Sequence, residues 1–401
     1  MYNIEFLEKK RNLQGRLPAR VSGVLLAMLG LMTGCVSVPS PVRDSRAEAP
    51  ASLDALFSEY DGLERAGASA VVIHEGRAVW TGAYGLAELE TRTPATPETQ
   101  YRLASLTKQF TAMAVLLLVG EGRLRYEDRL VDVLPGLPAA LGAVRVEHLL
   151  HHTSGVWDYE AFVPETQREQ VKDRDVPGLL ARAGGTYFPP GSAVRYSNSG
   201  YALLALVVER VGGMPFARFL KERIFTPLGM HAAVAHEEGR STVARRALGY
   251  VAGAGGFQPR DQSPTSAVLG DGGVYASVAE LVAWDAALDT HALIPADTQR
   301  LAWTAPLLPD GTSTHYGFGW FVDEDEGRPR LSHHGETCGF TNAIVKYPEQ
   351  RLTVIVLTNR AGGEPWRLAQ RLADRWLPPA AGPRAPVEAR PWPFEGMPHA
   401  R

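Results

Sequence analysis

The chain has 401 residues, 45% of them apolar and 21% charged, with a formal net charge of −3. This length and composition allow a large core, built as one large domain or as two packed lobes. Only the N-terminus has a basic cluster, which argues against a nucleic-acid partner, and two cysteines cannot build a disulfide framework.

The N-terminus carries a basic segment followed by a short apolar run. Five Lys or Arg residues lie between positions 9 and 20, and residues 21–32 are almost wholly apolar. Such a run is shorter than the ~20 residues of a spanning helix, so it indicates an export signal. It ends at Thr33-Gly34-Cys35, which resembles the bacterial lipoprotein signal, in which the cysteine is lipidated. A cleaved secretory signal and an uncleaved anchor are the alternatives.

We therefore expect an export signal over residues 1–35 and lipid attachment at Cys35. The membrane would be a partner through that lipid, with the protein in the bacterial cell envelope, facing the periplasm or the cell exterior. Residues 36–50, rich in Ser, Pro, Ala and Arg, predict a flexible tether. Residues 378–401 form a Pro-rich tail, so the folded domain is expected over residues 51–377.

Apolar spacing predicts strands at both ends of this domain and helices in the middle. A first helix is expected over residues 51–65, followed by a hairpin of residues 69–74 and 77–84. Three further strands are expected at residues 317–322, 341–347 and 352–358. Helices are expected at residues 109–119, 146–151, 201–211 and 216–224. The pattern predicts a two-lobed α/β (α+β) fold: one antiparallel β-sheet flanked by helices, with an inserted all-α lobe over roughly residues 107–268.

A serine and a lysine three positions apart stand at the start of an apolar helix. Ser105 and Lys108 share a helix face, which brings the amine within reach of the hydroxyl. Backbone N–H groups at a helix N-terminus stabilise an oxyanion. The pattern predicts Ser105 as a nucleophile, although Ser-x-x-Lys alone also fits a helix start with an exposed lysine.

The segment Tyr196-Ser197-Asn198 precedes another apolar helix. In an extended segment, Tyr196 and Asn198 point to the same side. A phenol with a pKa near 10 is a poor base unless a cation such as Lys108 lowers that value. Asn198 can hydrogen-bond both Lys108 and a substrate amide. A capping turn with a core tyrosine is the alternative.

The segment His333-His334-Gly335 precedes the strand expected at residues 341–347. A glycine on an edge strand allows a substrate backbone to approach closely and pair with the strand. The strand then offers an N–H to a developing oxyanion. Two surface histidines beside a turn are the alternative.

The order and spacing of the three motifs resemble those of the penicillin-binding-protein and class C β-lactamase family of serine hydrolases: Ser-x-x-Lys, Tyr-x-Asn and Lys/His-x-Gly. Other stretches are similar as well, including Leu-Leu-His-His-Thr-Ser-Gly at residues 149–155 and Tyr-Gly-Phe-Gly-Trp at residues 316–320. The resemblance covers roughly residues 53–359. It implies a β-lactamase/transpeptidase-like fold.

The resemblance also implies a role for each motif residue. Ser105 would attack a carbonyl and form an acyl-enzyme, while Lys108 and Tyr196 move its proton to the leaving group. The residues Asn198, His333 and Gly335 would bind substrate. The oxyanion hole would consist of the backbone N–H groups of Ser105 and Glu336. This route uses neither a metal nor an organic cofactor.

The third motif departs from dedicated β-lactamases, which usually have a lysine where this chain has His333. A histidine is only partly charged at neutral pH, so it should hold a substrate carboxylate less firmly. Glu336 adds a negative side chain nearby. We therefore expect an esterase, a D-amino-acid peptidase or a weak β-lactamase acting on a small-molecule or peptide substrate. Loops at residues 157–159 and 270–272 shape the pocket, and no motif specifies that shape or the oligomeric state.

The sequence offers three other functions. A zinc site could use His148 and His152, four positions apart, together with His151, His333 and His334. However, no acidic residue lies in a zinc-protease spacing between His148 and His152, and the sequence places no third ligand. Cys338 lies close in sequence to the third motif, but no base is assigned to it, so a packing role fits better. A catalytically silent, lipid-anchored binding or scaffolding protein on the same fold is the main alternative, and intact Ser105, Lys108 and Tyr196 argue against it.

Overall fold

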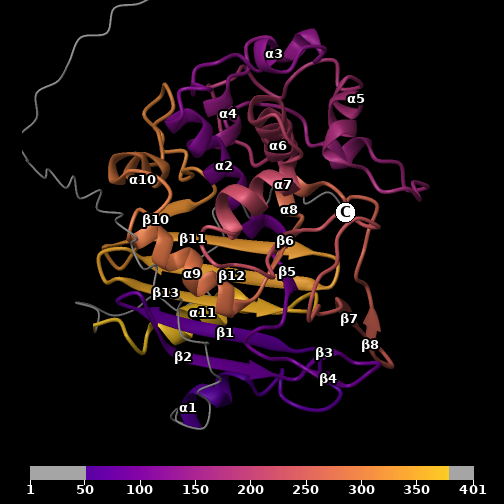
Figure 1. The fold of residues 1–401 in the computed structure, drawn as a ribbon, viewed down its shortest axis with the longest axis vertical. Coiled ribbons are helices and arrows are strands. Elements are labelled where there is room, and N and C mark those ends of the chain that lie inside the picture. The colour runs from indigo at the N-terminus through magenta and orange to yellow at the C-terminus, as the bar shows by residue number, and fades with distance from the viewer. Residues whose placement is uncertain (1–50, 379–401) are drawn as a thin grey trace, which may run out of the picture. The chain divides into compact units, whose positions relative to one another are not determined.

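A computed structural model describes residues 51–378 of the chain. The predicted export signal, Cys35 and the tether lie outside the described residues, as does nearly all of the tail. The main sheet is antiparallel, with strand order β10-β11-β12-β13-β1-β2 (Figure 1). Its strands are β1 (Ala68–His74), β2 (Arg77–Tyr84), β10 (Phe321–Asp325), β11 (Arg328–Thr337), β12 (Phe340–Tyr347) and β13 (Leu352–Thr358).

Strands from both ends of the domain meet in the middle of this sheet. β1 pairs with β13 along its whole length, from Ala68 opposite Thr358 to His74 opposite Leu352. In Figure 1 the indigo hairpin β1–β2 therefore continues the orange and yellow strands β10–β13. The predicted sheet and its N-terminal hairpin are confirmed.

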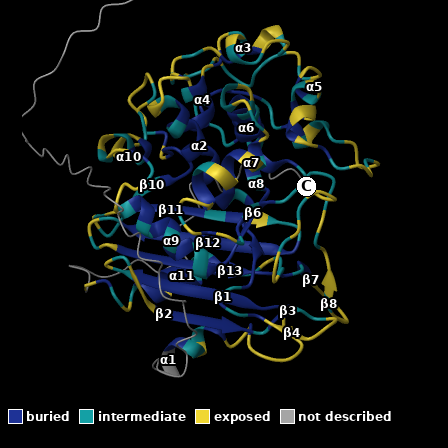
Figure 2. Ribbon diagram, in the orientation of Figure 1, coloured by how far each residue is buried: buried dark blue, intermediate teal, exposed yellow. Residues whose placement is uncertain are grey.

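Most residues of the main sheet are buried, as the dark blue strands in Figure 2 show, because alternating side chains point into a core on each side. Val71 and Ile73 face the larger core, whereas Ala70 and Val72 face the smaller one, as the two-residue period of a strand requires. On the larger-core side lies α9 (Val278–Asp289), and on the other side α11 (Pro365–Ala373) packs against β12 and β13.

The helices that carry the site lie on the larger-core side of the sheet. They are α2 (Lys108–Gly120), α3 (Leu130–Val133), α4 (Val146–Leu150), α5 (Val176–Leu180), α6 (Asn198–Gly212), α7 (Phe216–Leu220) and α8 (Leu269–Gly272). Short helical turns join them: η3 (Ala104–Thr107), η4 (Ala139–Leu141), η5 (Tyr159–Phe162), η6 (Asp173–Asp175) and the π-turn η7 (Lys221–Phe225). Within residues 51–378, no helix is both long and apolar enough to cross a membrane.

The predicted all-α lobe also contains strands. Residues 107–268 include β6 (Val234–Ala235), β7 (Tyr250–Gly253) and β8 (Gly256–Pro259), so the helices of this segment end with η7. The remaining elements are β3 (Leu86–Glu88), β4 (Thr93–Pro94), β5 (Tyr101–Arg102), β9 (Val274–Ala276) and α10 (Ala296–Ala302). Strands β5, β9 and β6 form a small sheet beside the site.

Two sequence predictions of elements need correction. The helix expected over residues 51–65 is only α1 (Ala51–Asp54) followed by η2 (Ala55–Phe57), because Gly62 takes a φ of 131° that no helix allows. Leu63, an apolar residue within the expected helix, is 73% exposed. The strand expected at residues 317–322 begins only at Phe321. Gly319 makes a close turn there, where an added Cβ would lie 2.8 Å from the Lys108 carbonyl oxygen.

Candidate active site

Ser105 lies on the η3 turn, which joins the edge of the small sheet to α2. The residue before it, Ala104, has a φ of 51°, a left-handed conformation that is strained for a residue with a Cβ. Strand β11 presses against this turn at Gly335. A Cβ added to Gly335 would collide with the Leu103 carbonyl oxygen and lie 3.2 Å from the Ser105 nitrogen. Position 335 must therefore be glycine so that the η3 turn, which carries Ser105, can pack against β11.

Lys108 is fully buried, and its amine contacts three oxygen atoms. The Nζ atom lies 3.0 Å from Ser105 Oγ, 2.9 Å from Asn198 Oδ1 and 2.9 Å from the Asp271 carbonyl oxygen. Burial lowers the pKa of Lys108 to about 8, against the opposing effect of nearby carboxylates. About a tenth of the amine is then neutral at pH 7.

The partners of Lys108 also fix where its lone pair points. The amide oxygen of Asn198 and the carbonyl oxygen of Asp271 can only accept hydrogen bonds. A neutral amine has two N–H donors, and these two acceptors engage both. The third direction, towards Ser105 Oγ, is then left to the lone pair. Lys108 is thus arranged to take the proton of the Ser105 hydroxyl.

Tyr196 completes this group of side chains. Its hydroxyl hydrogen-bonds the Ser105 side chain, and its ring centroid lies 4.9 Å from Lys108 Nζ. Burial raises the pKa of Tyr196 well above its usual value, although the bond to Ser105 acts the other way. The expectation that Lys108 would lower this pKa is therefore wrong, because burial dominates. Tyr196 can relay a proton as a neutral hydroxyl but does not act as a phenolate.

His152, in the turn that follows α4, holds the Tyr-x-Asn segment. The Nδ1 atom of His152 accepts the Ser197 backbone N–H at 3.2 Å, and its ring lies 4.2 Å from the Tyr196 ring. His148 Nδ1 instead accepts the backbone N–H of Arg145. Among residues 51–378, no three His, Cys, Asp or Glu side chains are grouped so that they could hold a metal ion.

His333 is fully buried on β11, beneath the aromatic rings of the site. Its Nδ1 lies 2.7 Å from the His334 carbonyl oxygen, which can only accept, so Nδ1 carries the proton. Nε2 then accepts from the Tyr316 hydroxyl at 2.9 Å. Burial lowers the pKa of His333 well below its usual value. The expected partial charge is therefore absent, and neither ring nitrogen is free to bind a substrate carboxylate.

Strand β11, which carries Gly335, extends beyond its neighbour β10 at the site. Phe321, the first residue of β10, pairs with Ser332, so residues 333–337 of β11 extend past β10. Glu336 lies on this stretch and is exposed. The oxyanion role of the Ser105 and Glu336 N–H groups stays a prediction. Cys338 follows in the turn, half-buried, with its Sγ 3.9 Å from Ser266 Oγ.

An acidic cluster that the sequence motifs did not predict lies beside Lys108 and consists of Asp158, Glu160 and Asp271. Asp158 accepts the backbone N–H groups of Asn198 at 2.9 Å and of Glu160 at 3.1 Å. The Tyr159 hydroxyl donates to Asp271 Oδ2 at 3.0 Å. Burial raises the pKa of all three carboxyl groups, to about 8 for Glu160 and about 6 for Asp271. Asp158 and Glu160 are two positions apart, but Asp271 is more than 100 positions further along the chain, so no spacing in the sequence joins it to them.

Comparisons with known proteins agree with this geometry. A family model described as Beta-lactamase matches residues 53–375. Penicillin-binding protein 4* of Bacillus subtilis is 31% identical over 77% of this chain and 71% of that protein. The penicillin-binding protein homologue of Pyrococcus abyssi has a TM-score of 0.71, is 26% identical, and aligns over 81% of this chain and 76% of its own.

A D-aminopeptidase of Cereibacter sphaeroides is 30% identical over 86% of this chain. The chain spans 66% of the length of that relative, and 56% of a D-aminopeptidase from Brucella anthropi. The match of the family model to most of the chain, together with the placement of Ser105 and Lys108, settles the classification. The chain belongs to the beta-lactamase family and is a serine hydrolase that acts through an acyl-enzyme.

Proposed function

We propose that this hydrolase cleaves amide or ester bonds whose acyl group carries a free amine next to the carbonyl, as an aminopeptidase or amino-acid amidase does. The proposal rests on the surroundings of the Glu160 carboxyl group. It is half-buried, and no described residue hydrogen-bonds it, whereas the carboxyl groups of Asp158 and Asp271 both accept hydrogen bonds. Glu160 is therefore free to bind a ligand.

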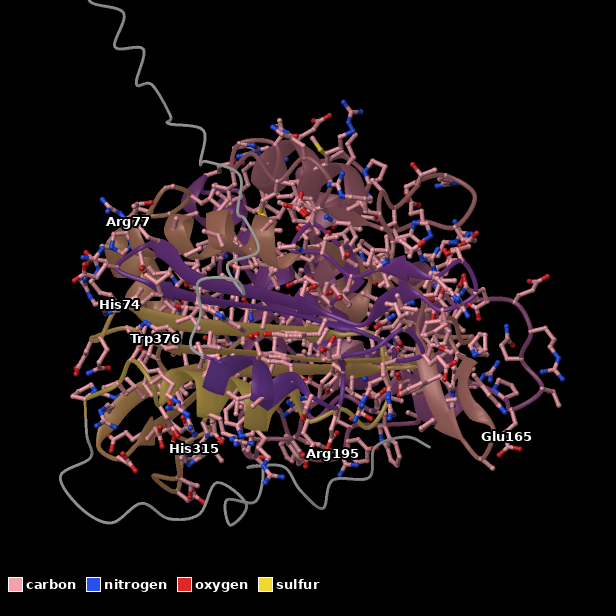
Figure 3. The ribbon with its side chains drawn as sticks, turned by 90° about the horizontal axis from the view of Figure 1, so that it is seen from below. His74, Arg77, Glu165, Arg195, His315 and Trp376 are labelled. Atoms are coloured by element: carbon pink, nitrogen blue, oxygen red, sulfur yellow. The ribbon has the colours of Figure 1, made fainter. Side chains whose placement is uncertain are left out.

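The charges around Glu160 favour a cationic ligand. Burial, followed by repulsion from Asp158 and Asp271, raises the pKa of Glu160 to about 8. A raised carboxyl pKa indicates that the site is partly desolvated and has a negative electrostatic potential. A bound ammonium group would offset this potential. Of the described cations, Lys108 faces Ser105, and Arg195, labelled in Figure 3, stacks over the Tyr187 ring at 4.0 Å.

The residues of the third motif do not favour a carboxylate ligand. His333 is neutral and both of its ring nitrogens are engaged, while Glu336 is an exposed negative side chain. β-Lactams and peptides that end in D-Ala both present a carboxylate, so they fit less well than amines. The resemblance to D-aminopeptidases supports the same choice and suggests a preference for D-residues.

The chemistry follows from the positions of the side chains. Ser105 Oγ attacks the carbonyl carbon while its proton passes to neutral Lys108. Through the Tyr196 hydroxyl the proton then reaches the leaving nitrogen or oxygen as its bond to carbon breaks, which leaves an acyl-serine. A water molecule attacks the acyl-serine, gives its proton to Lys108, and releases the acid as Ser105 regains a hydrogen.

The test compares D-alanine p-nitroanilide with its N-acetyl derivative. We expect kcat/KM at least 100-fold higher for the free amine and no turnover by Ser105→Ala. Glu160→Gln should remove most of that preference, because the ammonium loses its counter-charge. Glu165→Gln is the matched control, since Glu165 is exposed on the loop that follows η5 (Figure 3). Equal cleavage of the two substrates would overturn the proposal, and L-alanine p-nitroanilide tests the stereochemical preference.

We also propose that the protein is exported and attached to a membrane through a lipid on Cys35. The support is the sequence alone: a basic segment, a short apolar run and Thr33-Gly34-Cys35. Detergent phase separation of the full chain, with the mass of its N-terminal peptide, is the test. The wild type should enter the detergent phase and Cys35→Ala should not. An unmodified cysteine in the mature protein would contradict lipid attachment.

A further inference from the structure

Asp173 opens η6 and lies far from Ser105 in the sequence. Its side chain is 8% exposed, and both carboxylate oxygens are engaged. One accepts the backbone N–H of Leu269 at 2.8 Å, and the other accepts that of Gly270 at 2.9 Å. The motifs do not include Asp173, and the chemistry described above does not use it.

These two N–H groups begin the four-residue helix α8. The first N–H groups of a helix have no partner within it, so the Asp173 carboxylate satisfies both with charge-assisted hydrogen bonds. From the other side, the Thr111 hydroxyl donates to the Gly270 carbonyl oxygen at 2.6 Å. Gly270 has no space for a Cβ, which would collide with the Tyr201 carbonyl oxygen. The start of α8 is therefore held from three directions.

The next residue of α8 contacts the catalytic amine. The carbonyl oxygen of Asp271 accepts from Lys108 Nζ at 2.9 Å, and this contact helps to leave the lone pair pointing at Ser105. We propose that Asp173 is a positioning residue for the reaction: it fixes the Asp271 carbonyl and, through it, the orientation of Lys108. This inference rests on the proposed roles of Ser105 and Lys108.

The charge balance at Asp173 separates positioning from stability. Burial, with a smaller contribution from the negative charge of Asp271, raises the pKa of Asp173 to about 7, while hydrogen bonds from backbone N–H groups, those of Leu269 and Gly270 first, act the other way. Replacing Asp173 with asparagine removes a buried charge but leaves one of these N–H groups without an acceptor, which costs about 1–3 kcal/mol of stability. An effect on the orientation of Lys108 would appear in kinact of the folded protein.

The experiment measures acylation of Ser105 by a fluorophosphonate, followed by intact-mass spectrometry of the full chain, so that kinact and KI are separated. Asp173→Asn should lower kinact about 10- to 100-fold and leave KI unchanged, as expected when a reacting group is displaced slightly. Glu280→Gln is the matched control: Glu280 Oε1 accepts the N–H groups of Ala232 and Ala233 at 2.7 and 2.8 Å, outside the site. Thr111→Val, which removes the opposite contact, should also lower kinact.

The outcomes separate this inference from the proposed function. An unlabelled wild type would contradict the serine chemistry itself. A labelled wild type with unchanged kinact in Asp173→Asn would overturn the role of Asp173 and leave the hydrolase intact. An equal loss in Asp173→Asn and Glu280→Gln would show only general destabilisation, which also overturns it. If Asp173→Asn does not fold, unchanged kinact in Thr111→Val overturns it.

Discussion

Lys108 and Lys346 are both fully buried, yet they have different surroundings. Lys346 Nζ lies 2.9 Å from Asp285 Oδ1 and 2.6 Å from Asp289 Oδ1, between β12 and α9. Lys108 Nζ instead contacts a hydroxyl, an amide oxygen and a backbone carbonyl. A direct carboxylate partner compensates a buried ammonium, whereas neutral acceptors compensate it less, so burial can lower the pKa of Lys108. The partners decide whether a buried lysine serves the fold or the reaction.

The largest effect should come from replacing the catalytic amine. Lys108→Met should lower kinact for fluorophosphonate labelling by more than about 1,000-fold, because no other described group can take the Ser105 proton. Its unfolding free energy should equal or exceed that of the wild type, since an amine without a carboxylate partner is removed from the core. If Lys108→Met retained activity, Lys108 would not be the base that takes the Ser105 proton.

The same substitution at Lys346 should lower the stability of the fold and leave the labelling rate unchanged. Lys346→Met leaves the buried Asp285 and the half-buried Asp289 without their cation, which costs about 3–5 kcal/mol. Denaturant unfolding measures this loss. Labelling of Ser105 in the folded fraction should stay unchanged. A loss below about 1 kcal/mol would mean that this ion cluster is not what holds α9 against the sheet.

A smaller effect is expected at the aromatic neighbour of Lys108. Tyr196→Phe keeps the ring over the amine but removes the hydroxyl that bonds Ser105. We expect kcat for D-alanine p-nitroanilide to fall about 100-fold, since proton relay to the leaving nitrogen is lost. The unfolding free energy should change by less than about 1 kcal/mol. A pH profile identical in shape to that of the wild type would confirm that Tyr196 does not titrate in the working range.

The smallest effect is expected for Cys338, whose thiol is the other nucleophilic type of side chain near the site. Cys338→Ser should change neither labelling nor turnover, because among the described residues the thiol hydrogen-bonds only the Ser266 and Thr337 hydroxyls, at 3.9 Å each. The measurement is kcat/KM with D-alanine p-nitroanilide. A tenfold loss would reopen a catalytic role for Cys338.

Local patterns predicted the parts of the site that lie close in sequence. Ser105 and Lys108 are one helical turn apart, and Tyr196 and Asn198 two residues apart, so spacing alone brought each pair together. Short runs of β-branched and aromatic residues between turn signals were sufficient for β1, β2, β12 and β13, whose side chains reach two cores. α9 was missed although Ser277 and Glu280 form a capping box at its start, a signal that the sequence contains.

The rest depends on contacts between distant segments. Lys346 and Asp285 are 61 positions apart, and Asp173 bonds residues almost 100 positions away. The charge of His333 and the pKa of Tyr196 were misjudged for the same reason: both are set by burial, which motif spacing does not reveal. The free carboxyl of Glu160 likewise emerges only once η5, α6 and α8 are folded together.

The most direct test of the account is the pH dependence of Ser105 labelling by a fluorophosphonate. Because Lys108 must be neutral to accept the proton, the labelling rate should rise with pH and level off, with a midpoint of about 8. Glu160→Gln, which removes the other group with a pKa of about 8, should keep this rise. A rate independent of pH between about 6 and 9.5, or one still rising towards the ordinary lysine pKa of about 10.4, would contradict the role of Lys108 as a buried neutral base.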